Sequence, residues 1–122
     1  MVVVVFGTKM RDDADLEEYA RHSRRMNELV KQIPGFISIK GFVGENGEEI
    51  SIARFESDEA VKAWRSQPEH LLTQRRAREA FYESYWVQVC NTIRDYAWHM
   101  PNSPSPLVGE GRGGGASAPG LR

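Results

Sequence analysis

Residues 34–70 read PGFISIKGFVGENGEEISIARFESDEAVKAWRSQPEH, and this stretch decides the fold. Its first half holds two runs rich in β-branched and aromatic residues, 36–43 and 48–56, which are typical of strands. Between them stands Asn46-Gly47, a dipeptide that fits the tight turn of a β-hairpin. This half of the stretch therefore predicts two antiparallel strands joined by a short turn.

The second half of the stretch predicts one helix in two pieces. Ser57 is a favourable N-cap for a helix over residues 58–66, whose apolar side chains share one side. Pro68 cannot continue that helix but is well suited to begin the next one, which is expected over 69–83. The first piece turns its apolar residues inward, and these are Ala60, Val61 and Trp64.

One strand and one helix precede the stretch, and one strand follows it. Residues 2–10 are β-branched and apolar and predict a buried strand. Apolar side chains recur at helical spacing over 14–33, until Pro34-Gly35 ends the pattern. Residues 84–95, rich in Val, Ile, Tyr and Trp, predict the last strand. The order βαββαβ is that of a ferredoxin-like α+β fold, an antiparallel sheet with helices on one face only.

The face of the sheet without helices is predicted to be apolar. The last strand alternates Tyr85, Val87, Val89 and Ile93 on one face with Trp86, Gln88, Cys90 and Thr92 on the other, and the first strand carries Val or Phe on both faces. A solvated sheet face is normally polar, and an exposed apolar face is a liability in a monomer. We therefore expect a homodimer in which the open face packs on a second copy of the chain.

Length and charge exclude several classes of protein. The chain has 122 residues, enough for one domain, and a formal net charge of −1, which argues against a nucleic-acid binder. Its one cysteine, Cys90, allows no internal disulfide and no cysteine-based zinc site. The apolar run after Met1 is too short for a signal peptide or a membrane span, so we expect a cytoplasmic protein without membrane contact.

The composition changes near residue 100. We predict a domain over residues 1–98 and a disordered tail over 99–122, which is rich in Gly, Pro and Ser and lacks aromatic residues from Pro101 onward. Such a segment cannot bury enough surface to offset the entropy of ordering it. The tail is either a flexible interaction segment or an extension without function.

Signature motifs of common catalytic classes are absent from the sequence. It contains no Gly-rich nucleotide loop, no nucleophile elbow and no metalloprotease motif. The three histidines, His22, His70 and His99, lie far apart and lack the spacing of metal ligands. We therefore expect neither a metal nor a bound cofactor.

The predicted helix 69–83 places polar residues on its inward face. At about 100° per residue, His70, Gln74 and Arg78 share a side. The apolar residues on that side are Leu71, Ala77 and Phe81. Polar groups on an inward face need partners or a polar cavity. This face is therefore the candidate wall of a binding site.

A pocket between the helices and the sheet would bring further side chains to this wall. Trp64 points inward from the preceding helical piece, and His22 on the first helix could reach the rim. Two plainer explanations stay open. His70 could be an exposed or backbone-bonded residue near a helix start, and Trp64 could serve core packing alone.

The chain resembles the antibiotic biosynthesis monooxygenase family of dimeric α+β barrels. The resemblance rests on stretch 34–70, with its PGF, its FESDEAVKAW and its PEH, and on 75–95, with its FYESYWVQVC. It implies a homodimer with a pocket in each subunit between sheet and helices. Members of the family oxidise phenolic polycyclic aromatics to quinones without metal or flavin, and another branch degrades haem.

The resemblance also implies roles for the residues of the candidate wall. A base removes the proton of a phenol, a dry pocket holds the anion, and oxygen accepts an electron from it. His70 is the candidate base, because imidazole titrates near pH about 6.5. Arg78 or Gln74 would stabilise the phenolate or the oxygen-derived anion, and Trp64 would stack on the aromatic ring. The candidate catalytic residues are His70 and Arg78, and the candidate substrate contacts are Trp64, Gln74, Phe81 and His22.

The sequence leaves three functions open as hypotheses. The first is a cofactor-independent monooxygenase that oxidises a small phenolic or quinol-type aromatic with molecular oxygen. The second is a dimer that binds a small ligand without catalysis, and the third is a haem-binding or haem-degrading protein. Haem-degrading members carry an asparagine on the first strand, where residues 2–8 have none. Quinone-forming members carry an asparagine one turn before their tryptophan, where this chain has Ala60.

Overall fold

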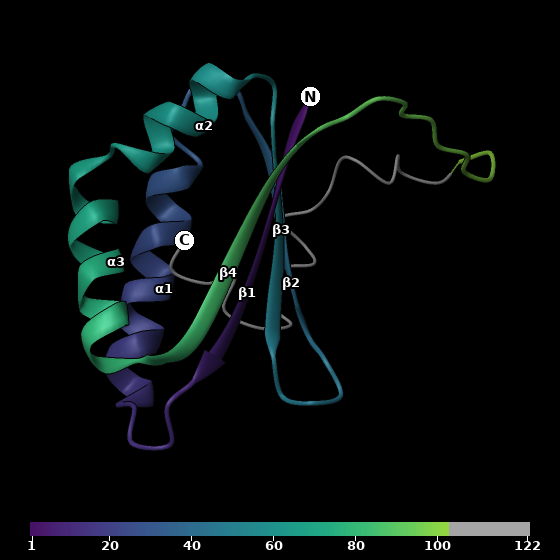
Figure 1. Ribbon diagram of the computed structural model, residues 1–122. Coiled ribbons are helices and arrows are strands. Elements are labelled where there is room, and N and C mark those ends of the chain that lie inside the picture. Colours follow the sequence, from purple (N-terminus) through teal and green to yellow (C-terminus); the bar gives the residue numbers. More distant parts are fainter. Residues whose placement is uncertain (103–122) are drawn as a thin grey trace.

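Within residues 1–102, which the computed structural model describes, four strands form one antiparallel sheet in the order β2-β3-β1-β4. Three helices cover one face of the sheet and leave the other face open (Figure 1). This is the ferredoxin-like α+β architecture that the sequence predicts. The elements are β1 (Val2–Met10), α1 (Leu16–Val30), β2 (Phe36–Val43), β3 (Glu49–Phe55), α2 (Asp58–Arg65), α3 (Pro68–Ala80) and β4 (Tyr82–Asn91).

The predicted tail over 99–122 lies almost entirely outside the described residues. Residues 99–102 belong to no helix or strand, and their side chains are exposed. None of the helices in residues 1–102 combines the length and the apolarity needed to cross a membrane.

Side chains near the helix ends explain where the elements begin. The Asp15 carboxylate caps α1 by accepting hydrogen bonds from two backbone amides of the first turn, each at 3.1 Å. The Ser57 hydroxyl caps α2 by accepting from the Ala60 amide at 3.2 Å. Between α1 and β2, Gly35 has a φ of +92°, and a Cβ there would lie 2.9 Å from the Cβ of Ala60. Glycine therefore allows both the turn and the close approach of α2.

Helix α3 is shorter than predicted. It ends at Ala80 instead of at Glu83. The amide of Phe81 donates to the carbonyl of Ala77 at 2.9 Å, and the Phe81 side chain is fully buried. The chain leaves the helix after this residue because its aromatic ring is held in the core.

Strand β4 lies earlier in the sequence than predicted, over Tyr82–Asn91 instead of over 84–95. Its first residue pairs with Met10 at the end of β1, and its last residue pairs with Val2 at the start of β1. Beyond this pair one more backbone hydrogen bond forms, from the Thr92 amide to the Met1 carbonyl at 3.0 Å. The pairing with β1 therefore sets where β4 begins and ends, and the composition of β4 alone does not.

The core lies between the inner face of the sheet and the three helices. Alternate residues of β1 point inward and are buried, as the period of a strand requires. Two edge-to-face aromatic contacts link α1 to the start of β4, because Tyr19 packs on Phe81 at 5.6 Å and on Tyr82 at 6.4 Å between ring centroids. The largest core side chains are Phe6, Tyr19, Met26, Phe55, Trp64, Phe81 and Tyr82.

Two charged contacts fasten α1 to α3 on their outer side. The Arg76 guanidinium donates to both oxygens of Glu18 at 2.8 Å, and Arg25 donates to both oxygens of Glu69 at 2.9 and 2.7 Å. The hydrogen bonds from Arg76 lower the pKa of Glu18 to about 2, against the opposing effect of desolvation. The helix pair is therefore joined by a carboxylate that stays ionised far into the acid range.

This contact predicts a pH-dependent share of the stability. The folded-state pKa of Glu18 lies below its ordinary value of 4.5, so the contribution is present above about pH 4.5 and is lost as the pH falls toward about 2. Arg76→Gln should lower the melting temperature at neutral pH, and its difference from wild type should shrink across that window. Thermal melts followed by circular dichroism at a series of pH values check this. A difference that stays constant down to about pH 2 contradicts it.

The open face of the sheet is apolar in large part, but by strand alternation it also carries Lys40, Arg54 and Gln88. Trp86 of β4 lies across Gly7 of β1, where any Cβ would overlap the indole, and its Nε1 donates to Glu48 at 2.7 Å. Glycine at this position lets a large ring lie flat on the sheet. By strand alternation, the same face carries Val3, Val5, Ile50, Ile52 and Phe42.

Candidate functional site

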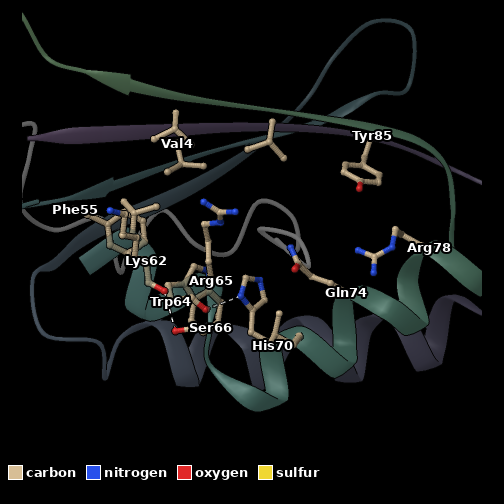
Figure 2. A pocket seen from close by; sticks show the side chains of 14 residues that line it. Val4, Phe55, Lys62, Trp64, Arg65, Ser66, His70, Gln74, Arg78 and Tyr85 are labelled. Atoms are coloured by element: carbon tan, nitrogen blue, oxygen red, sulfur yellow. Dashed lines mark hydrogen bonds between the residues drawn. The ribbon is translucent and has the colours of Figure 1, made fainter. Parts of the chain in front are cut away.

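A cavity of about 660 Å³ lies between the inner face of the sheet and helices α2 and α3 (Figure 2). The sheet contributes Val4, Phe55, Tyr85, Val87 and Val89. The segment from α2 to its end contributes Val61, Lys62, Trp64, Arg65 and Ser66. Helix α3 contributes His70, Leu71, Gln74 and Arg78. The cavity has the size and the mostly apolar character of sites for small organic molecules.

His70 is held at the start of α3 by the turn that separates the two helical pieces. The Gln67 side chain caps α3 by accepting from the His70 amide at 2.8 Å, and Pro68 opens the helix. The His70 Nδ1 lies 2.9 Å from the carbonyl oxygen of Trp64. A carbonyl only accepts, so Nδ1 carries a proton in this contact, and in the neutral ring the basic lone pair belongs to Nε2.

Trp64 supports His70 instead of presenting an open aromatic wall. The indole and imidazole rings are stacked, with 3.9 Å between their centroids and 12° between their planes. Only 3% of Trp64 is exposed, so the expected stacking of a substrate on this ring does not fit its surroundings. Among the described residues, no acceptor faces the Trp64 Nε1. Both the ring and the backbone of this residue fix the position of His70.

The inward face predicted for α3 meets the cavity. His70, Gln74 and Arg78 stand on successive turns and point toward the sheet, where Tyr85 of β4 faces them (Figure 2). His70 is buried, Gln74 is half-buried and Arg78 is exposed. The exposure of this polar row therefore increases along α3 from His70 to Arg78.

Two of the predicted substrate contacts lie away from the cavity. Phe81 is fully buried between α1 and the start of β4, because it follows the end of α3 and packs on Tyr19. His22 stays on the flank of α1, where its Nε2 lies 3.3 Å from Glu18 and its ring is 5.9 Å from that of Phe81. These two residues do not line this cavity, and their contact with a substrate stays a prediction.

Sequence reasoning missed two residues that line the cavity. Tyr85, with 46% of its surface exposed, is the accessible aromatic side chain of the wall. Its alternation with Val87 and Val89 placed it on one face of the last strand, but nothing in the pattern showed that this face meets the helices. Arg65, the last residue of α2, also lines the cavity and was not singled out.

The charge of the cavity wall is positive. Lys62, Arg65 and Arg78 line the cavity together with His70, and no acidic side chain is found among the described residues that line it. Across residues 1–102, His, Cys, Asp and Glu side chains form no group of three or more that is placed to hold a metal ion. The arrangement suits an aromatic molecule that carries or develops negative charge.

Comparison with known proteins places the chain in a family. The model of the antibiotic biosynthesis monooxygenase family matches residues 1–76. The chain belongs to this family. The YqjZ protein of Bacillus subtilis (strain 168), described as uncharacterized, is 30% identical to this family member over 76 residues. These residues cover 62% of this chain and 67% of YqjZ.

Solved structures confirm the monooxygenase-family fold. Rv0793 from Mycobacterium tuberculosis superposes with a TM-score of 0.68 at 20% identity, over 79% of this chain and 98% of that one. SnoaB, a cofactor-independent oxygenase from Streptomyces nogalater, superposes with a TM-score of 0.64 at 14% identity, over 77% and 94%. At these identities the likeness shows a shared fold, and the chemistry of this antibiotic biosynthesis monooxygenase family member depends on the residues of its own cavity.

Proposed function

We propose that this chain is a cofactor-independent oxygenase that converts a small phenolic aromatic to a quinone with molecular oxygen. The observation that carries the proposal is His70, whose Nδ1 donates to the Trp64 carbonyl in the wall of a mostly apolar cavity. That contact makes Nε2 the basic atom of the neutral ring, which is what removal of a phenol proton needs. Family membership and the fold shared with SnoaB support the proposal.

The reaction balances without any other reductant. A phenol and one O₂ give a quinone and one water, and the substrate supplies all of the electrons. His70 accepts the phenol proton, and the anion passes one electron to oxygen. The two radicals then join in a carbon–oxygen bond. His70 returns its proton to the peroxide oxygen, and loss of the ring hydrogen with cleavage of the O–O bond then leaves a carbonyl on the ring and releases water.

Other residues of the cavity have separate roles in this reaction. Gln74 stands one helical turn from His70 and Arg78 stands two turns away, so both can donate to oxygen atoms that become negative during the reaction. The side chains of Val4, Val87 and Val89 make the opposite wall apolar, which strengthens such electrostatic contacts. Tyr85 offers an accessible ring for contact with the substrate.

Oxygen uptake by the purified full-length chain tests the proposal. A panel of anthrones, dihydroxynaphthalenes and hydroquinones is supplied with a metal chelator present. We expect uptake above the uncatalysed rate with at least one member of the panel, together with the absorbance of the quinone product. Binding of panel members without any uptake above that rate would count against the proposal.

One observation favours a second candidate, a dimer that binds small molecules without catalysis. His70 has a structural task that needs no reaction, because its hydrogen bond to the Trp64 carbonyl joins α2 to α3. This candidate predicts saturable binding of aromatic probes without a product. The oxygen-uptake measurement separates the two candidates.

We also propose that the protein works as a homodimer that buries its open sheet face. Trp86 and Phe42 on that face are 39% and 50% exposed, and the segment after β4 exposes further apolar side chains. That segment runs away from the helices (Figure 1) and carries Ile93, Tyr96, Trp98 and Met100.

The molecular mass of the protein in solution tests whether it forms a homodimer. Light scattering at micromolar concentration should give twice the mass of one chain. Trp86→Glu, which replaces a large apolar side chain of that face with a charge, should shift the mass toward one chain and leave the cavity residues in place. A wild-type mass of one subunit at that concentration contradicts the homodimer.

A further inference from the structure

Arg65 and Arg78 differ from the other described arginines because they line the cavity and form no ion pair with any described residue. Arg11, Arg25 and Arg76 each donate to both oxygens of a carboxylate, at distances of 2.7–2.9 Å. Arg65 forms no such pair with any described residue, although it lines the cavity. Arg65 is exposed, as are Arg21, Arg24 and Arg75, which also have no ion pair, but those three do not line the cavity.

The side chain of Arg65 reaches into the cavity. Figure 2 shows its guanidinium extending from the end of α2 toward Val4 on the sheet, on the same side as the His70 ring. A basic residue in the last turn of α2 also suits the negative end of the helix dipole. That effect accounts for a positive charge at this position, but it does not direct the side chain into an apolar cavity.

The backbone places Arg65 beside the candidate base. The carbonyl that accepts from His70 Nδ1 at 2.9 Å is that of Trp64, and its carbon is bonded to the Arg65 nitrogen. The Cα of Arg65 therefore follows, across one peptide bond, the carbonyl group that the His70 ring contacts. An anionic group bound by Arg65 would lie next to the hydroxyl group whose proton His70 accepts.

Another cation of the cavity wall is already paired. Lys62 lies one turn before Arg65 and its Nζ is 3.2 Å from Asp58. A guanidinium presents a planar fork of donors that matches a carboxylate, as three other arginines of this chain demonstrate. No acidic side chain is found among the described residues that line the cavity, so none of them balances the charge of Arg65.

We infer that the substrate is an aromatic hydroxy acid, whose carboxylate binds Arg65 beside the phenol that faces His70. The inference rests on the proposed function for the role of the phenol, and it adds the substrate class and a specificity-determining residue. Arg65 binds the carboxylate and takes no part in proton transfer or in oxygen chemistry.

Binding without turnover tests the inference separately from the proposed reaction. Two probes are titrated calorimetrically under nitrogen into the full-length protein, 1-hydroxy-2-naphthoic acid and 1-naphthol, which differ by one carboxylate. Wild type should bind the acid at least about tenfold more tightly. Arg65→Gln should remove about that factor for the acid and leave 1-naphthol unchanged, and Arg65→Lys should fall between the two.

Arg75→Gln is the matched control, because it removes the same charge from an exposed position on α3 outside the cavity. It should leave both affinities unchanged. Equal wild-type affinities for the two probes, no binding of the acid, or an equal loss in Arg75→Gln overturns the inference. Oxygen uptake with neutral phenols is read independently, so either proposal can fail while the other stands.

Discussion

His70→Ala is expected to lower turnover of the oxidised substrate by about 10²–10⁴-fold, the usual effect of removing a general base. The expectation follows from the hydrogen bond between Nδ1 and the Trp64 carbonyl, which makes Nε2 the basic nitrogen of the neutral ring. Steady-state oxygen uptake, normalised to the folded fraction, measures the effect. Added imidazole should restore part of the lost rate, because it supplies the missing base.

A structural role for His70 would also lower activity, so a second variant is needed. His70→Asn keeps an amide donor near the position of Nδ1 and can still bond the Trp64 carbonyl, but it cannot accept the phenol proton. We expect near-wild-type melting and the same loss of turnover. The acid limb of the wild-type pH–rate profile should also disappear in this variant. Unchanged turnover in a folded His70→Asn variant removes His70 from the mechanism.

Trp64→Ala is expected to cost about 3–5 kcal/mol of folding free energy, as truncation of a large buried aromatic residue does. The indole is 3% exposed and covers the His70 ring at 3.9 Å, so its loss leaves a cavity beside the candidate base. Turnover should fall along with stability, because the imidazole is no longer held. Urea unfolding followed by circular dichroism gives the free energy.

Trp64→Phe is the matched control for this prediction. It keeps an aromatic face against His70 and removes an indole N–H that meets no acceptor among the described residues. We expect a cost below about 1.5 kcal/mol and turnover close to wild type. If Trp64→Ala were as stable and as active as Trp64→Phe, the support of His70 by this ring would be refuted.

Local signals were enough to predict most of the fold. Asn46-Gly47, Ser57 and Pro68 mark their turn and helix starts by backbone chemistry that acts over a few residues. The end of α3 and the limits of β4 could not be predicted in this way. They depend on the burial of Phe81 and on the length of β1, which are properties of partners distant in sequence.

The candidate site was predictable only in part. Helical geometry grouped His70, Gln74 and Arg78 correctly, because residues four apart on one helix share a face. It could not show what lies opposite that face, so Tyr85 was missed. It also could not show that His22 contacts Glu18 on the flank of α1 and does not line the cavity.

The origin of the oxygen in the product tests the central claim most directly. The account holds that the substrate itself reduces O₂ and keeps one of its two oxygen atoms. The full-length protein is incubated with an active anthrone or naphthol under ¹⁸O₂, with chelator present, and the quinone is analysed by mass spectrometry. We predict one ¹⁸O atom per quinone formed. A quinone without label, accompanied by hydrogen peroxide, would mean simple dehydrogenation and would contradict the account.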